Sequence, residues 1–202
     1  MEQAINIVLR AMFMENLALV FLLGMCTYIA VSKRVETAIG LGAAMMVVLF
    51  VTVPVNQLMY QSLLAPGALA WAGYPELDLS FLRFIVFIGV IAALVQILDL
   101  FLERFFLRLH QALGIYLPLL TVNCAILGAS LFMVQRSLTF ADSVAYGTGV
   151  GAGWAFAVIM FAAIRERLRY SDAPEGLRGL GLSFIVTGLL AFAVSGLAGI
   201  EV

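Results

Sequence analysis

The chain has 202 residues, of which 64% are hydrophobic and 11% are charged, and its formal net charge is −1. A soluble domain is about 45–50% apolar and about 25% charged, so this chain has too few polar side chains to cover an ordinary solvated surface. The composition predicts an integral membrane protein without a soluble catalytic domain, and the charge gives no indication of nucleic-acid binding.

Six apolar segments follow one another along the chain, and each approaches the roughly 20 residues that a membrane-spanning helix needs. Their length and lack of alternation favour α-helices, so the predicted fold is an all-α integral membrane protein. The longest break between them is Tyr60–Ser80, which is rich in Pro, Gly and aromatic residues. We expect spans at Ile5–Val31, Ala38–Met59, Phe81–Phe101, Ala112–Val134, Ala141–Ile164 and Leu177–Gly199.

Lys and Arg are unequally divided between the two faces that six spans define. The face that carries both termini receives three of them: Arg10, Arg83 and Arg136. The opposite face receives the other eight: Lys33, Arg34, Arg104, Arg108, Arg165, Arg167, Arg169 and Arg178. Because Lys and Arg concentrate on the cytoplasmic face, we expect both termini to lie outside the cytoplasm.

Short matches relate the two halves of the chain, in the same order and at similar separations. The first pair is GMCTYIAVS with VNCAILGAS, the second is GLGA with GVGA, and the third is LSF with LSF. Each half holds three predicted spans, so the second half must be inverted relative to the first. We therefore expect an inverted 3+3 repeat, about 1–105 and 106–202, with interrupted first and fourth helices. Pro118 is expected to contribute to the second interruption by kinking the helix.

Cys26 and Cys124 are the only cysteines, and they occupy matching places in the two halves. Free cysteine often packs as a small hydrophobe, and that interpretation applies to each one taken alone. Their symmetry favours a metal site instead, because thiolates select zinc, copper(I) or iron–sulfur clusters. A cluster usually needs four Cys, so a partner chain would supply two. The neighbouring Thr27 and Asn123 could donate hydrogen bonds to the sulfurs or could make ordinary interhelix contacts.

Charged residues near the spans give further candidates. Asp99 and Glu103 lie one helical turn apart, and two carboxylates on one face could guide a hard cation such as Na⁺. The alternative is an ordinary helix end paired with Arg104 or Arg108. Glu15 lies either within the first predicted span or at its outer edge, and within the span it would need a partner, for which Arg10 is available.

Small residues recur at one place in the fifth predicted span. Gly147, Gly149, Gly151 and Gly153 form a stripe that predicts close helix packing. A phosphate-binding loop is not expected there, because these glycines lie within a span and no strand precedes them.

Several stretches are distinctive beyond their composition. They are ENLALVFLLGMCTYIAVSKRVETAIGLG (Glu15–Gly42), LGIYLPLLTVNCAILG (Leu113–Gly128) and GTGVGAGWAFAVIMFAAIRERLRYSDAPEGLRGLG (Gly147–Gly181). They resemble the family that includes two paired membrane subunits of the Na⁺-translocating NADH:quinone reductase and their relatives in the Rnf complex. Details such as VTVPVNQLMY (Val51–Tyr60) and FMVQR (Phe132–Arg136) favour the E-type subunits of the reductase over the A-type subunits of Rnf.

The resemblance implies a role in a bacterial inner-membrane Na⁺ pump. It implies a [2Fe–2S] cluster or iron centre shared with the homologous D-type membrane subunit in a pseudo-symmetric pair, with Cys26 and Cys124 as this chain's ligands. NADH, flavins and ubiquinone would be bound by other subunits, so no catalytic residue is expected here. The alternatives are an Rnf-type electron-transport subunit, a cofactor-free secondary transporter, which an inverted repeat would equally suit, or a scaffold protein.

Overall fold

The computed structural model describes residues 2–65, 80–107, 110–111, 114, 116–170, 174, 176 and 179–198. Within these ranges the chain is helical and holds no strand. The elements are α1 (Glu2–Leu9), η1 (Arg10–Met14), α2 (Met25–Val31), α3 (Val35–Met59), η2 (Tyr60–Leu64), η4 (Ser80–Leu82), α4 (Arg83–Phe105), α6 (Leu117–Thr121), α7 (Cys124–Gln135), α8 (Phe140–Leu168) and α9 (Leu180–Ala198).

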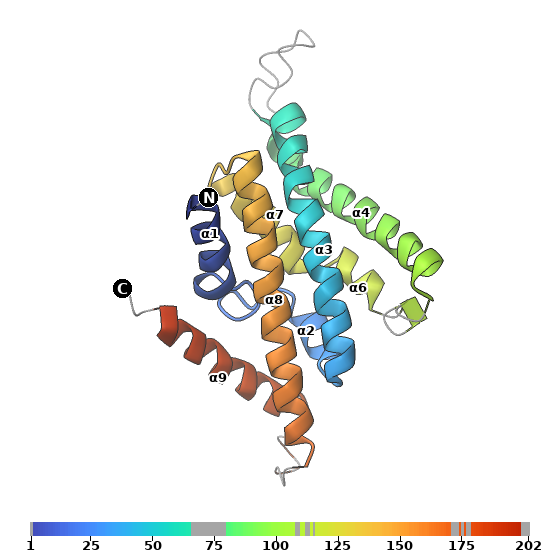
Figure 1. The fold of residues 1–202 in the computed structure, drawn as a ribbon, viewed down its shortest axis with the longest axis vertical. Coiled ribbons are helices and arrows are strands. Elements are labelled where there is room, and N and C mark those ends of the chain that lie inside the picture. The colour runs from blue at the N-terminus through green and yellow to red at the C-terminus, as the bar shows by residue number, and fades with distance from the viewer. Residues whose placement is uncertain are drawn as a thin grey trace.

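Two long helices, α3 and α8, pack against each other with opposite directions and form the centre of the molecule (Figure 1). The α1–η1 segment packs on α8, and α7 packs on α3. The helices α4 and α9 diverge from opposite sides of the central pair (Figure 1). The start of α8 is set by Thr139, whose hydroxyl accepts a hydrogen bond from the Asp142 N–H and satisfies a main-chain donor of the first turn.

The glycine stripe of α8 explains why its neighbours approach so closely. Gly147 and Gly151 lie one turn apart and meet α3: an added Cβ would lie 2.7 Å from the Leu49 carbonyl oxygen and 2.9 Å from the Met46 Cα. The other two glycines, Gly149 and Gly153, meet the α1–η1 segment. The prediction of close helix packing is confirmed, and the stripe serves two neighbouring helices at once.

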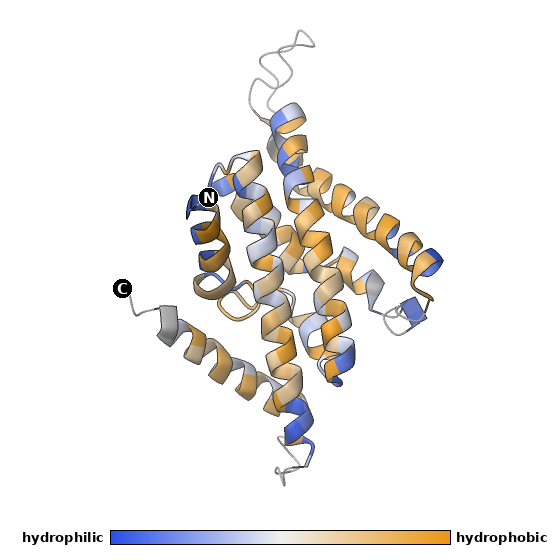
Figure 2. Ribbon diagram, viewed as in Figure 1, coloured by the Kyte–Doolittle hydropathy of each residue, from blue (hydrophilic) through white to orange (hydrophobic). Residues whose placement is uncertain are grey.

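Apolar residues dominate the middle of the helices, and hydrophilic residues gather at their ends (Figure 2). Among the described residues, four helical segments are long and apolar enough to cross a membrane by length and composition: Val35–Leu64, Arg83–Phe105, Pro118–Gln135 and Phe140–Leu168. Leu180–Gly196 is a shorter apolar helix. The first predicted span, Ile5–Val31, is divided between α1–η1 and α2.

Several helices extend beyond the predicted spans. Helical structure continues from α3 through Leu64, and α4 and α8 run to Phe105 and Leu168. A helix satisfies its main-chain hydrogen bonds internally whatever its side chains are, so it can continue into charged sequence at the membrane surface. Most of the predicted loop Tyr60–Ser80 lies outside the described residues, as do Ala112, Leu177 and Gly199, where predicted spans begin or end.

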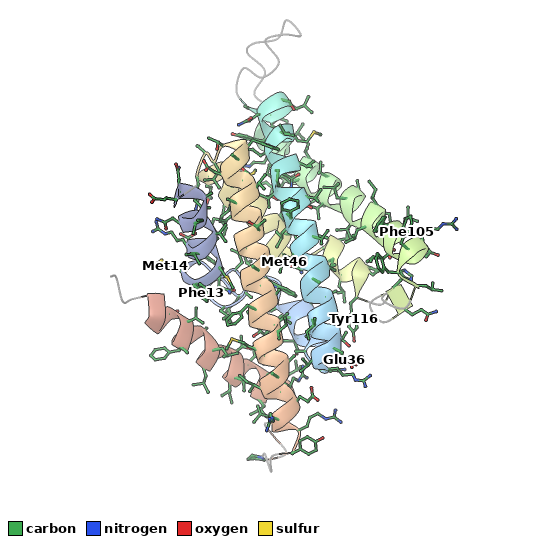
Figure 3. All side chains as sticks on the ribbon, in the orientation of Figure 1. Phe13, Met14, Glu36, Met46, Phe105 and Tyr116 are labelled. Carbon is green, nitrogen blue, oxygen red and sulfur yellow. The ribbon has the colours of Figure 1, made fainter. Side chains whose placement is uncertain are left out.

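The flanking helices expose large apolar side chains. In Figure 3, side chains of α4 and α9 project away from the central pair, and Phe105 stands at the outer end of α4. Phe105 is 68% exposed, Leu189 is 67% exposed and Phe192 is 82% exposed in the single chain. Apolar surface of this extent requires lipid or another protein as its neighbour.

Candidate functional site

Both cysteine-bearing segments are interrupted helices. The first is broken between Met14, where η1 ends, and Met25, where α2 begins. The second is broken at Val122 and Asn123, between α6 and α7. Cys26 is the second residue of α2 and Cys124 is the first residue of α7. Each thiol therefore lies at the N-terminal end of a short helix.

The prediction that Pro118 disrupts the second segment is wrong in its placement. Pro118 lies in the first turn of α6, where its missing N–H would have no helical acceptor, so it is compatible with the helix start. The interruption comes after Thr121 instead. Shortly after the end of α6, Asn123 has extended backbone angles and forms the N-terminal cap of α7.

Asn123 joins the two interruptions. Its side-chain oxygen accepts a hydrogen bond from the Ala125 N–H at 2.9 Å, which caps α7. Its side-chain nitrogen donates to the Thr27 hydroxyl at 2.9 Å. Thr27 in turn donates to the Gly24 carbonyl oxygen at 2.9 Å. Both side chains are buried, at 2% and 0% exposure, so these bonds form away from solvent.

These contacts decide between the two roles considered for Thr27 and Asn123. The single hydroxyl proton of Thr27 is used by Gly24, and the Asn123 amide points to Thr27 and, at 3.9 Å, to the Met45 sulfur. Neither donor is directed at a cysteine. The residues make an interhelix polar contact, and they act on the cysteines by holding the starts of α2 and α7 together.

The two thiols have a different environment from their neighbours. Cys26 and Cys124 are both unpaired and exposed, whereas Thr27, Asn123 and Ala125 are buried. The described part of the chain contains no group of three or more His, Cys, Asp or Glu side chains that could hold a metal ion. Two thiolates are half of the ligand set of an all-Cys cluster. Their position on the outside of the chain fits a centre completed by a second protein.

Gly24 makes the close approach of the two breaks feasible. Its φ of 80° lies in the left-handed region, and an added Cβ would lie 2.7 Å from the Asn123 side-chain oxygen. We expect Gly24→Ala to destabilise the protein by about 1–3 kcal/mol, from backbone strain together with the clash. Thermal unfolding of the purified protein in detergent measures this loss.

Gly179→Ala is the matched control for that substitution. Gly179 has a φ of 96° but no atom within 4 Å of its added Cβ. It therefore tests backbone strain without the clash, and we expect a smaller loss of stability. Equal losses at both positions would contradict a special packing role for Gly24.

Asn16 stabilises the longer first interruption, and its role was not predicted. Its side-chain nitrogen donates to the Gly153 carbonyl oxygen at 2.8 Å, and its side-chain oxygen accepts from the Ala18 N–H at 3.0 Å. Asn readily bonds to nearby main chain in this way and favours turns over helix interiors. An Asn within an apolar segment was the available sequence signal for this break.

Glu15 lies beside Asn16 and has two cationic partners. Its carboxylate is 3.6 Å from the Arg10 side chain, as predicted, and it also contacts Arg136, which had not been predicted as a partner. These residues line a cavity of about 410 Å³ together with Ile7, Leu138 and Tyr146. Arg136 follows α7, so this ion pair connects the end of the second interrupted segment to the first.

The two candidate cation-guiding carboxylates lie near the end of α4, away from the cysteines in sequence. A side-chain oxygen of Asp99 is 3.1 Å from the His110 Nε2. Asp99 is thus paired with His110, whereas Arg104 and Arg108 had been considered as its partners. Arg108 lies outside the described residues. Glu103 is exposed one turn further along the helix.

Comparison with known proteins matches residues 4–201 to the family model described as "Rnf-Nqr subunit, membrane protein". The chain belongs to the Rnf-Nqr family. A relative from Psychromonas ingrahamii, named as the E subunit of a Na(+)-translocating NADH-quinone reductase, is 61% identical over 201 residues, covering 100% of both chains.

Two further relatives of this Rnf-Nqr chain carry the same name. The protein from Pseudoalteromonas translucida is 59% identical over 100% of both chains. The protein from Hahella chejuensis is 58% identical over 99% of this chain and 98% of its own length. The aligned region therefore includes both interrupted segments and both cysteines.

Proposed function

We propose that this chain is the E-type subunit of a Na⁺-translocating NADH:ubiquinone reductase and that Cys26 and Cys124 serve electron transfer across the membrane. The name that the relatives share, over essentially the full length, supports the identity. The observation that carries the role is the pair of exposed thiols at the starts of two short helices that Asn123 and Thr27 hold together.

The donor set fits a shared centre. This chain offers two thiolates, and a [2Fe–2S] cluster usually takes four, so the homologous D-type membrane subunit would contribute the other two in a pseudo-symmetric pair. When bound, such a centre supplies a one-electron carrier within a hydrocarbon layer about 30 Å thick. The chain's own residues position the two thiols and keep water from the Asn123–Thr27 contact. NADH, flavins and quinone would bind to other subunits.

We further propose the inverted repeat of three and three spans, with halves of about 1–105 and 106–202. Two serines support it. Ser32 accepts a hydrogen bond from Arg165 of α8 at 2.8 Å, and Ser130 accepts one from Asn56 of α3 at 2.8 Å. Each serine lies six residues after its cysteine. The number of residues between Asn56 and Arg165 equals the number between Gly40 and Gly149, which begin the matching GLGA and GVGA motifs. The repeat would therefore relate Asn56 to Arg165, as it relates the two serines.

A second pair of contacts supports the same symmetry. An added Cβ on Gly42 would lie 3.1 Å from the Ala155 Cβ, and one on Gly151 would lie 2.9 Å from the Met46 Cα. Under the same separation Gly42 corresponds to Gly151, and Met46 corresponds to Ala155. A twofold axis between α3 and α8 would produce such exchanged pairs. With six spans and the Lys and Arg bias, both termini would be periplasmic in a bacterial inner membrane.

Iron and acid-labile sulfide in the purified complex test the shared centre. Wild type and Cys26→Ala are compared after confirming that the same subunits co-purify. Loss of a stoichiometric iron–sulfur centre in the variant is the expected result. Unchanged iron and sulfide would return Cys26 to a packing role and favour a cofactor-free transporter or scaffold. An Rnf-type role would instead appear as a different set of partner subunits.

The carboxylates of α4 are proposed to guide Na⁺ at the cytoplasmic end of that helix. We expect Asp99→Asn combined with Glu103→Gln to raise the Na⁺ concentration that half-saturates activity by about threefold to tenfold, since each carboxylate attracts a cation by an exposed, screened interaction. Glu36→Gln, at the start of α3 near the same predicted face, is the control. An unchanged Na⁺ dependence would leave Asp99 as the local partner of His110.

A further inference from the structure

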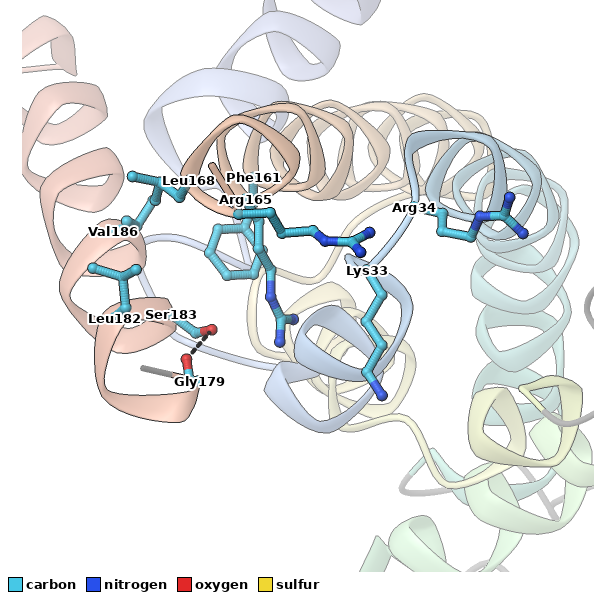
Figure 4. A pocket seen from close by; sticks show the side chains of 10 residues that line it. Lys33, Arg34, Phe161, Arg165, Leu168, Gly179, Leu182, Ser183 and Val186 are labelled. Carbon is cyan, nitrogen blue, oxygen red and sulfur yellow. Dashed lines mark hydrogen bonds between the residues drawn. The ribbon is translucent and has the colours of Figure 1, made fainter. Parts of the chain in front are cut away.

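A cavity of about 640 Å³ opens between the C-terminal end of α8 and the N-terminal end of α9. Its lining combines cationic and apolar side chains: Lys33, Arg34, Phe161, Arg165, Leu168, Arg169, Gly179, Leu182, Ser183 and Val186. Figure 4 shows Leu182 and Val186 of α9 across from Phe161 and Arg165 of α8, with Lys33 beyond Arg165. The cysteines take no part in it.

The cationic wall is held in place by the fold. The Arg165 guanidinium donates to the Ile29 carbonyl oxygen and to the Ser32 hydroxyl, both at 2.8 Å, and so ties the end of α2 to α8. This anchor fixes Lys33, which follows Ser32 directly, beside the last turns of α8. Arg169 follows α8 immediately. Four cations from two segments, the link between α2 and α3 and the end of α8, therefore line one cavity. The bias of charge toward one membrane face does not by itself produce such a cluster.

The position and chemistry of this cavity suit an amphipathic anion. It lies where two apolar helices reach their charged ends, which is the depth of lipid headgroups. Arg and Lys bind phosphate oxygens by charge-assisted hydrogen bonds. The half-buried apolar side chains of the lining, Leu168 and Leu182, would lie along a hydrocarbon chain, and a soluble phosphate compound has no group for them. The helices α8 and α9 diverge from this point (Figure 1).

We propose that this cavity binds the phosphate headgroup of an anionic phospholipid, phosphatidylglycerol or cardiolipin, with one acyl chain against α9. The lipid fills the space between α8 and α9 and fixes the angle at which α9 leaves the central pair. This inference goes beyond electron transfer and does not depend on the cysteines.

Lipid retention by the intact complex tests the proposal. The complex is purified in mild detergent, and its bound lipids are identified by native mass spectrometry. The variant is Lys33→Gln with Arg169→Gln, which spares Arg165 because that residue holds Ile29 and Ser32. Each cation removed is expected to weaken anionic lipid binding about fivefold, or roughly 25-fold together. Arg167→Gln, on α8 but outside the cavity lining, is the matched control and is expected to retain the lipid.

A second measurement uses the wild-type complex alone, so the test survives a variant that fails to assemble. The delipidated complex is heated after adding phosphatidylglycerol, phosphatidylcholine or inorganic phosphate. Protection by phosphatidylglycerol alone supports the lipid site. Equal protection by inorganic phosphate would indicate a soluble anion, and equal protection by phosphatidylcholine would remove the need for the cations. The proposal would also be overturned if the Lys33→Gln, Arg169→Gln variant kept its anionic lipid, or if it lost no more lipid than Arg167→Gln does. A polypeptide found in the cavity would overturn it as well.

Discussion

Replacing Cys26 or Cys124 by alanine is expected to abolish NADH-driven quinone reduction by the assembled complex. If the two thiolates hold half of an electron-carrying centre, either loss leaves an incomplete ligand set, and the electron then faces a hydrocarbon layer about 30 Å thick without an intermediate carrier. NADH oxidation with an artificial electron acceptor at the cytoplasmic subunits should persist. The two rates, measured on the same preparation, locate the block within the membrane.

Val122→Ala is the control for this prediction. Val122 is 69% exposed and lies two residues before Cys124, so truncating it alters the same surface without removing a thiolate. Activity close to wild type in this variant, beside full loss in both cysteine variants, would assign the effect to the sulfur. Quinone reduction that survives in either cysteine variant would rule out an essential electron-transfer role for that residue.

Gly147→Val is expected to cause the largest loss of stability among substitutions outside the cysteine site. An added Cβ at Gly147 would lie 2.7 Å from the Leu49 carbonyl oxygen and 3.2 Å from the Val53 Cβ, so α3 and α8 would have to separate. Overpacking a well-packed core costs about 1–3 kcal/mol, and the rigid main chain of α3 places this case at the upper end. The fraction of protein that stays monodisperse in detergent after heating measures the effect.

The same change on α9 provides the comparison. Gly188 is helical and has no atom within 4 Å of an added Cβ. Gly188→Val alters helix propensity equally and adds the same volume without a clash in the single chain. We expect it to leave the melting midpoint nearly unchanged. If both variants lost the same stability, helix propensity rather than the α3–α8 contact would account for the effect.

Local signals predicted much of this structure because they depend on few residues. Apolar runs predicted the helices, and the alternating glycines of Gly147–Gly153 predicted close packing, since a missing side chain has the same effect whichever helix approaches. Glu15 and Arg10 are near in sequence, and their ion pair was expected. The predicted role of Pro118 was wrong because proline disrupts a helix interior but suits a helix start. The helix start at Leu117 was not evident from the sequence.

Contacts between distant segments could not be predicted in the same way. Asp99 was considered with the nearby Arg104 and Arg108, yet its partner is His110, on the chain that follows α4. Thr27 and Asn123 each lie beside a cysteine, and the sequence did not decide whether they donate hydrogen bonds to the sulfurs or make interhelix contacts. Their hydrogen bond to each other depends on how two broken helices meet, and Gly24 permits that approach.

The sequence by itself determined that the chain is a helical membrane protein, because hydrophobic length and main-chain hydrogen bonding act within each segment. Its motifs resemble those of the Rnf-Nqr family, to which the chain belongs. The matching places of Cys26 and Cys124 in the two halves also made them the candidate ligands. Only the tertiary structure decided that both thiols lie on the outside of the chain. Only packing could bring Lys33, Arg165 and Arg169 around one cavity, because the direction in which each helix leaves its neighbour is set by contacts across the whole molecule.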